Sequence, residues 1–184
     1  MARIKTSCYL TQGDYADVSF GNSTVAQIGC GVCTLAMHLL NKVSDEMTDS
    51  LKKSVVKAVA NSSLFTDGSM CWPPKSTTFK INNKYYSIGY KKTIDIAAEV
   101  INGNTGFVHF TASDGTHTAS HFVLVDGIYS NESDPLKKLL VVDPSYGDSR
   151  TLYEAMAANY DYNELQNITP STAHLNANLK CVFD

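Results

Sequence analysis

The segment of this chain best suited to chemistry is a cysteine between two glycines, Gly29-Cys30-Gly31, followed by a run of good helix formers. This pattern predicts a helix that begins at Cys30 and carries the thiol at its N-terminus. Backbone N–H groups lack partners there, and the helix dipole favours negative charge. A thiolate in that position has a lowered pKa and is a nucleophile near neutral pH. The two glycines leave room for a substrate to approach the sulfur.

A second cysteine, Cys33, follows at a spacing that has three interpretations. A redox pair would follow a strand in a thioredoxin-like unit, but residues 21–28 make a poor central strand. Half of a zinc site would need a second pair of ligands, and His117 and His121 have a suitable spacing. In the third interpretation, which we favour, Cys30 is the nucleophile and Cys33 is a small apolar residue one turn along the helix. For the motif taken alone, a merely buried cysteine is the structural alternative.

A cysteine nucleophile needs an imidazole within hydrogen-bond reach and a third group that orients the imidazole. His121 is the best placed of the five histidines, because it begins the most hydrophobic strand-like run and would lie at the mouth of a rigid sheet. The next such run ends in Asp143. If the two runs pair as an antiparallel hairpin, Asp143 lies beside His121 and can orient its ring. The remaining histidines have structural or solvated interpretations: His38, His109, His117 and His174.

Periodicity and turn signals predict the elements that must position these side chains. Helices are expected over residues 30–43, 49–61, 93–101 (capped by Thr93) and 151–160. Strands are expected over residues 80–90 (or a hairpin turning at Asn82-Asn83), 106–110, 121–129 and 139–143, with a short extended segment over 8–12. Residues 14–23, 61–76 and 130–138 are expected to be loops, and the last two to shape the cleft. Helices that precede antiparallel strands predict an α+β fold, in which N-terminal helices pack on an antiparallel sheet within one domain, residues 1–184.

Composition excludes several classes of protein. The formal net charge of the 184 residues is −3, and without a basic stripe nucleic acid is not an expected partner. The sequence has no apolar run of about 18 residues, so no membrane span is expected. The N-terminal residues lack the apolar core of a secretory signal, which predicts a chain that is cytoplasmic as synthesised. Five cysteines, an odd and scattered set, do not form a disulfide framework.

Four motifs in this order resemble the papain-like cysteine peptidases of family thirty-nine. That family includes the double-glycine leader peptidases of bacteriocin exporters and a broad set of stand-alone relatives. The motifs are Tyr9-Leu10-Thr11-Gln12-Gly13-Asp14, Cys30-Gly31 with Leu35-Ala36-Met37, His121-Phe122-Val123-Leu124-Val125-Asp126-Gly127, and Val141-Val142-Asp143-Pro144. The resemblance covers about residues 8–160 and implies a papain-like fold. It implies that Cys30 is the nucleophile, His121 the base, Asp143 the orienting residue and Gln12 the oxyanion donor.

The sequence departs from that family at Val32-Cys33, where stand-alone relatives often have Pro-Thr. It carries no transporter domains, so a role as a bacteriocin exporter and cleavage of double-glycine leaders are not assumed. The expected function is a cysteine peptidase that hydrolyses a peptide or isopeptide bond in a peptide or protein substrate, with no metal or organic cofactor.

Two other functions stay open. One is a cell-wall amidase or endopeptidase that acts on peptidoglycan, reaching it from a phage particle or through a holin. The other is a non-catalytic binding module on the same scaffold. The sequence does not specify an oligomeric state.

Overall fold

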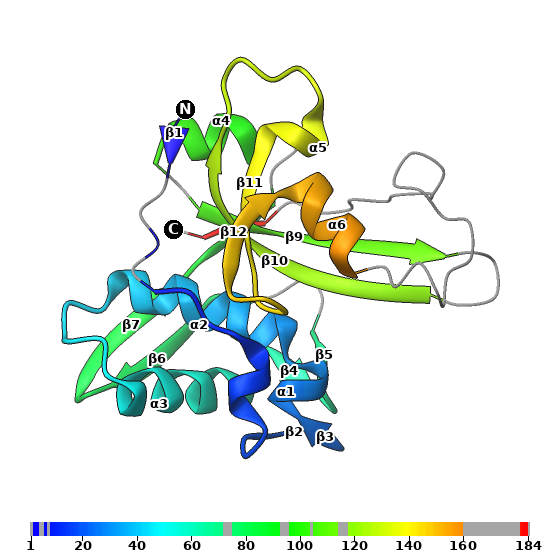
Figure 1. Ribbon diagram of the computed structural model, residues 1–184. Helices are drawn as coiled ribbons and strands as arrows, with labels where there is room; N and C mark the ends of the chain where they lie inside the picture. The colour runs from blue at the N-terminus through cyan, green and yellow to red at the C-terminus, as the bar shows by residue number, and fades with distance from the viewer. Residues whose placement is uncertain are drawn as a thin grey trace.

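Helices and antiparallel strands combine in a mixed α+β fold (Figure 1), seen in a computed structural model. The structure describes residues 2–3, 6, 8–71, 75–92, 96–103, 105–113, 118–159 and 181–183. The expected cap at Thr93 and the histidines His117 and His174 lie outside these residues. The α+β fold class expected from the sequence, with helices and an antiparallel sheet, is confirmed by these elements.

The described helices begin with a short 3₁₀ segment. They are η1 (Gln12–Tyr15), α1 (Val25–Ile28), α2 (Cys30–Lys42), α3 (Asp49–Ala60), α4 (Ile96–Ile101), α5 (Pro135–Lys138) and α6 (Leu152–Asn159). The described strands of the large sheet are β1 (Ala2–Arg3), β8 (Tyr90–Lys92), β9 (Thr105–Ser113), β10 (Thr118–Ile128), β11 (Leu139–Asp143), β12 (Asp148–Thr151) and β13 (Cys181–Phe183). Separate hairpins are formed by β2 (Ser19–Phe20) with β3 (Ser23–Thr24), β4 (Phe65–Thr66) with β5 (Ser69–Met70), and β6 (Thr77–Ile81) with β7 (Lys84–Ile88).

The strands of the large sheet are antiparallel and follow the order β12-β11-β10-β9-β13-β8, with β1 also paired to β10. The expected hairpin of residues 121–129 and 139–143 is confirmed, since Leu124 of β10 pairs with Val142 of β11. Short connections explain the order from β9 to β12, because consecutive antiparallel strands pair most easily through such turns. Strand β13 instead lies between β9 and β8, far from both in the sequence.

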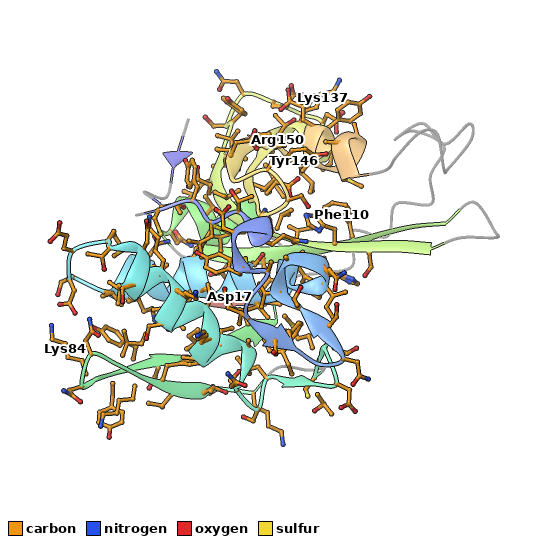
Figure 2. The ribbon with its side chains drawn as sticks, turned by 60° about the horizontal axis from the view of Figure 1, so that its bottom comes forward. Asp17, Lys84, Phe110, Lys137, Tyr146 and Arg150 are labelled. Carbon is orange, nitrogen blue, oxygen red and sulfur yellow. The ribbon has the colours of Figure 1, made fainter. Side chains whose placement is uncertain are left out.

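Both faces of the sheet are covered, which explains the unbroken apolar sequence of its central strands. Leu124 packs into a core with the helices α2 and α3, whereas its neighbours Val123 and Val125 pack into a second core with α4 and α6. Figure 2 shows Lys84 at the lower left of the molecule, Lys137 at its top, and Phe110 of β9 at the right, at a height between the two lysines. The cores therefore fix β10 from both sides.

The two main N-terminal helices have nearly the predicted bounds. In α3, Leu51, Val55, Val56 and Val59 are buried as their spacing predicts. The Thr48 hydroxyl caps this helix by accepting a hydrogen bond of 3.2 Å from the Leu51 N–H. In the β6–β7 hairpin, Asn82 and Asn83 have φ values of 48° and 61°. This left-handed pair is typical of a tight two-residue turn, and it confirms the hairpin interpretation.

Several local expectations are wrong. Residues 8–11 form neither helix nor strand, and Gln12 begins η1 instead of ending an extended segment. The expected loops 14–23 and 61–76 contain the β2–β3 and β4–β5 hairpins, and 130–138 contains α5. Strands of two residues are too short to show alternation, so no periodicity could reveal them. None of the described helices is long and apolar enough to span a membrane.

Candidate active site

A cleft of about 730 Å³ lies where the start of α2 meets β10. Cys30, His121 and Gln12, all singled out from the sequence, line it together. Its apolar wall includes Phe65 and Met70 from the β4–β5 hairpin. The expected contribution of residues 61–76 is thus confirmed, whereas residues 130–138 supply no lining residue and that expectation is wrong.

Cys30 is the first residue of α2, as predicted, and its side chain is half-buried. Burial of the sulfur opposes its ionisation. The hydrogen bond and positive charge of His121, together with the backbone N–H groups of Phe122 and Gly31, outweigh burial and hold the pKa of the thiol below its ordinary 9.0. Three residues therefore favour the thiolate form of this sulfur over the neutral thiol.

His121 and Asp143 form a buried pair behind the thiol. The His121 Nε2 lies 2.8 Å from Oδ1 of Asp143, whose side chain is fully buried. Burial alone would lower the pKa of His121, but its hydrogen bonds to Asp143 and Cys30, and the negative charges of both, raise it from 6.5 to about 9. With Nε2 held by the carboxylate, Nδ1 is the ring nitrogen left for the sulfur.

Sheet register explains why these three groups meet. The pairing of β10 with β11 ends at Leu124 and Val142, whereas β10 pairs with β9 as far as Thr118. His121 therefore lies where β10 extends past the end of β11 (Figure 1), and Asp143 is the last residue of β11. Helix α2 packs against β10, and the Thr34 hydroxyl donates a 3.3 Å hydrogen bond to the Phe122 carbonyl. This contact aligns the start of α2 with His121.

Gln12 reaches the same cleft from η1. Its backbone N–H donates a 2.7 Å hydrogen bond to the Pro144 carbonyl, directly after Asp143. The side-chain Nε2 donates to the Ala26 carbonyl at 3.2 Å. A primary amide has two N–H groups, and the second one has no partner among the residues that the structure describes. It is available to an oxygen atom in the cleft.

Sequence reasoning missed three neighbours of the site. The Ser145 N–H donates a 2.9 Å hydrogen bond to Oδ1 of Asp143, and its hydroxyl lies 3.4 Å from Nε2 of His121. Phe110 packs edge-on against the His121 ring, with centroids 5.5 Å apart. His109, interpreted as a packed histidine, lines the cleft and stacks on Phe122 at 4.4 Å. The sequence Asp143-Pro144-Ser145 did indicate the Ser145 contact. An aspartate side chain often accepts a hydrogen bond from the backbone N–H two residues later.

The remaining candidates lie away from this chemistry. Cys33 is fully buried in α2, and burial raises the pKa of its thiol, which agrees with its interpretation as an apolar residue. His38, also on α2, is buried, and burial lowers its pKa to about 3. Within the described ranges, no group of three or more His, Cys, Asp or Glu side chains could hold a metal ion. His117, needed for the zinc alternative, is not among the described residues.

Comparisons with known proteins find no matching family model, no matching curated protein and no matching solved structure.

Proposed function

We propose that this protein is a papain-like cysteine peptidase that hydrolyses a peptide or isopeptide bond with Cys30 as nucleophile. One observation carries the proposal: a helix-terminal thiol is hydrogen-bonded to a buried imidazole whose other nitrogen is held 2.8 Å from a carboxylate, at the wall of an open cleft. An imidazole between a thiol and a carboxylate is the arrangement required for nucleophilic acyl transfer.

In the proposed reaction, the Cys30 proton resides on His121 and Asp143 holds the resulting imidazolium in position. The thiolate attacks the carbonyl carbon, and the C–N bond breaks as His121 gives its proton to the leaving amine. Water, deprotonated by His121, then hydrolyses the thioester and releases the acid. The raised pKa of His121 and the lowered pKa of Cys30 support this sequence, because they favour the charged pair.

The developing oxyanion has two candidate donors. The backbone N–H of Cys30, as the first residue of α2, lacks an intrahelical acceptor. The second is the unpaired N–H of the Gln12 amide. Removal of one such donor costs about 3–4 kcal/mol of transition-state stabilisation in hydrolases, so the Gln12 side chain is expected to contribute mainly to kcat.

The test is hydrolysis by the purified protein with Cys30→Ala as the decisive variant. A mixture of denatured proteins is incubated with the enzyme, and new peptide N-termini are identified by mass spectrometry. Purified peptidoglycan is assayed in parallel for released peptide fragments. We expect new N-termini from the protein mixture, and their loss in Cys30→Ala.

Cys71→Ala is the matched control, because this half-buried thiol hydrogen-bonds Thr66 and lies outside the catalytic group. Equal turnover by wild type and Cys30→Ala would remove Cys30 from the reaction. Cys30-dependent release from peptidoglycan alone would assign the cell-wall amidase or endopeptidase activity instead. A folded protein with no turnover on either material, and with Cys30 alkylated as slowly as Cys71, would favour a binding module.

A further inference from the structure

Strand β10 is interrupted five residues after His121 by a β-bulge at Asp126. Val125 pairs with Val141 and Gly127 pairs with Leu140, so Asp126 is an extra residue inserted opposite two consecutive residues of β11. Its side chain is fully buried. Bulges near active sites commonly redirect a side chain, and a buried carboxyl group requires hydrogen-bond donors.

The donors come from segments far away in the sequence. The Thr6 hydroxyl donates to Oδ1 of Asp126 at 2.5 Å, and the Tyr9 hydroxyl donates to Oδ2 at 3.4 Å. Ser149 of β12 donates to Oδ2 at 3.2 Å. Asp126 therefore attaches the N-terminal segment to the same sheet that carries His121 and Asp143.

That N-terminal segment leads directly to Gln12, three residues after Tyr9. Residues 8–11 have no helix or strand to hold them, so individual contacts determine their path. At the far end, the Gln12 N–H bonds the Pro144 carbonyl at 2.7 Å, and Thr11 lies against Gly147. Leu10 lies between the two ends, buried in the first core with its N–H 3.4 Å from the Met37 sulfur. Asp126 supplies the near end, and these contacts together set the position from which the Gln12 amide enters the cleft.

We propose that Asp126 is a positioning residue for catalysis, which acts by holding the segment that presents the Gln12 amide to the oxyanion. The inference rests on the proposed function. An oxyanion donor must be held to within about 0.5 Å. The Gln12 amide has one side-chain contact of its own, the Ala26 carbonyl, so its placement also depends on the path of the Gln12 backbone.

The experiment removes the two donors on the segment and keeps the buried carboxyl group. The double variant Thr6→Val/Tyr9→Phe loses both hydroxyls, while Ser149 still donates to Asp126. The matched control is Thr78→Val/Tyr129→Phe, with the exposed Thr78 on β6 and the exposed Tyr129 after β10. Each pair is made in the wild-type background and in Gln12→Ala, and kcat and KM are measured on a substrate cleaved by the wild type.

We expect Thr6→Val/Tyr9→Phe to lower kcat about tenfold. This loss is smaller than the roughly 100- to 1000-fold loss expected when the Gln12 amide itself is deleted. KM and the pH profile of Cys30 alkylation should not change, and the control pair should have wild-type kcat. In Gln12→Ala, the same pair should cause no further loss, because the group that it positions is gone.

A loss of equal size in both backgrounds, or no loss in the wild-type background, would overturn the inference while Cys30-dependent turnover stands. An absence of Cys30-dependent turnover in the wild type would instead refute the proposed function, and this inference with it.

Discussion

At the scale of single residues, the site depends on mutual stabilisation of two charges that would each be unfavourable alone. Burial disfavours both the Cys30 thiolate and the His121 imidazolium, but the two opposite charges stabilise each other. Asp143 adds a hydrogen bond to the His121 Nε2, which further stabilises the imidazolium. The pair is charged between the lowered pKa of the thiol and a pH of about 9, where His121 loses its proton. Activity should be greatest in that window.

Asp143→Asn should narrow this window from both sides. Loss of the carboxylate lowers the pKa of His121, so the alkaline limit of kcat/KM, near pH 9 in the wild type, moves to lower pH. The weaker imidazolium stabilises the thiolate less, so the acid limit moves to higher pH. We expect kcat to fall about 10²- to 10⁴-fold. The pH profiles of kcat/KM and of Cys30 alkylation by iodoacetamide measure both limits.

Asp45→Asn is the control for that substitution, because Asp45 is an aspartate on the surface that binds Asn82 and Lys84. It should leave both limits in place. An unchanged alkaline limit in Asp143→Asn would mean that this carboxylate does not raise the pKa of His121.

The sequence could identify the three central side chains because each stands at the boundary of a strongly patterned element. Cys30 begins an apolar helix, Asp143 ends an apolar strand, and His121 begins the apolar run of β10, although that strand itself starts earlier, at Thr118. His109 and Ser145 could not be ranked in this way. Their proximity to the site depends on the pairing of β9 with β10 and on the path of one turn, which are tertiary properties.

At the scale of elements, the turn between β11 and β12 joins the acid to the oxyanion donor. The N–H groups of Tyr146 and Gly147 donate to the Asp143 carbonyl at 3.1 and 2.7 Å. Gly147 has a φ of +67°, and a Cβ built on it would lie 2.2 Å from Oγ1 of Thr11. The turn therefore needs glycine both for its left-handed backbone and for the close approach of the residue before Gln12.

Gly147→Ala should consequently lower stability and activity together. A left-handed alanine costs about 1–2 kcal/mol, and displacement of Thr11 adds to this loss and misplaces Gln12. Gly103→Ala is the matched control, because Gly103 has a φ of +85° but no atom within 4 Å of its built Cβ. Urea unfolding should show a lower free energy of unfolding in both variants, with the larger decrease in Gly147→Ala. Only Gly147→Ala should also lower kcat. Equal losses of stability and equal kcat would mean that the Thr11 contact has no importance.

The long elements could be predicted from the sequence, and the short ones could not. In α3 and β10, many side chains repeat a buried pattern, so periodicity defines the element. The β2–β3 and β4–β5 hairpins depend on a contact between their turns instead. A Cβ on Gly21 would lie 2.6 Å from the Gly68 backbone nitrogen, and nothing in either local sequence indicates that approach. The pairing of β13 with β9 is equally non-local.

At the scale of the whole molecule, the site lies where two cores share one sheet. Cys30 begins a helix of the first core, which contains Leu39 and Cys33, and His121 lies on the strand that also contributes Val123 to the second core. Shared strands transmit a packing defect in one core to the other. The cleft geometry should therefore depend on both cores, and the described parts of the chain should unfold as one cooperative unit.

Met156→Ala tests this coupling, because Met156 of α6 is fully buried in the second core. The cavity should lower the free energy of unfolding by about 2–5 kcal/mol. In urea, the loss of helical circular dichroism and the alkylation of Cys33, located by peptide mass spectrometry, should shift together to a lower midpoint, although Cys33 belongs to the first core. Ile101→Ala, on a side chain that is 62% exposed, should change the free energy by about 0.5 kcal/mol or less. If Met156→Ala left the midpoint of Cys33 alkylation at the wild-type urea concentration, the cores would unfold independently, and the packing around α6 would have no part in holding His121 against Cys30.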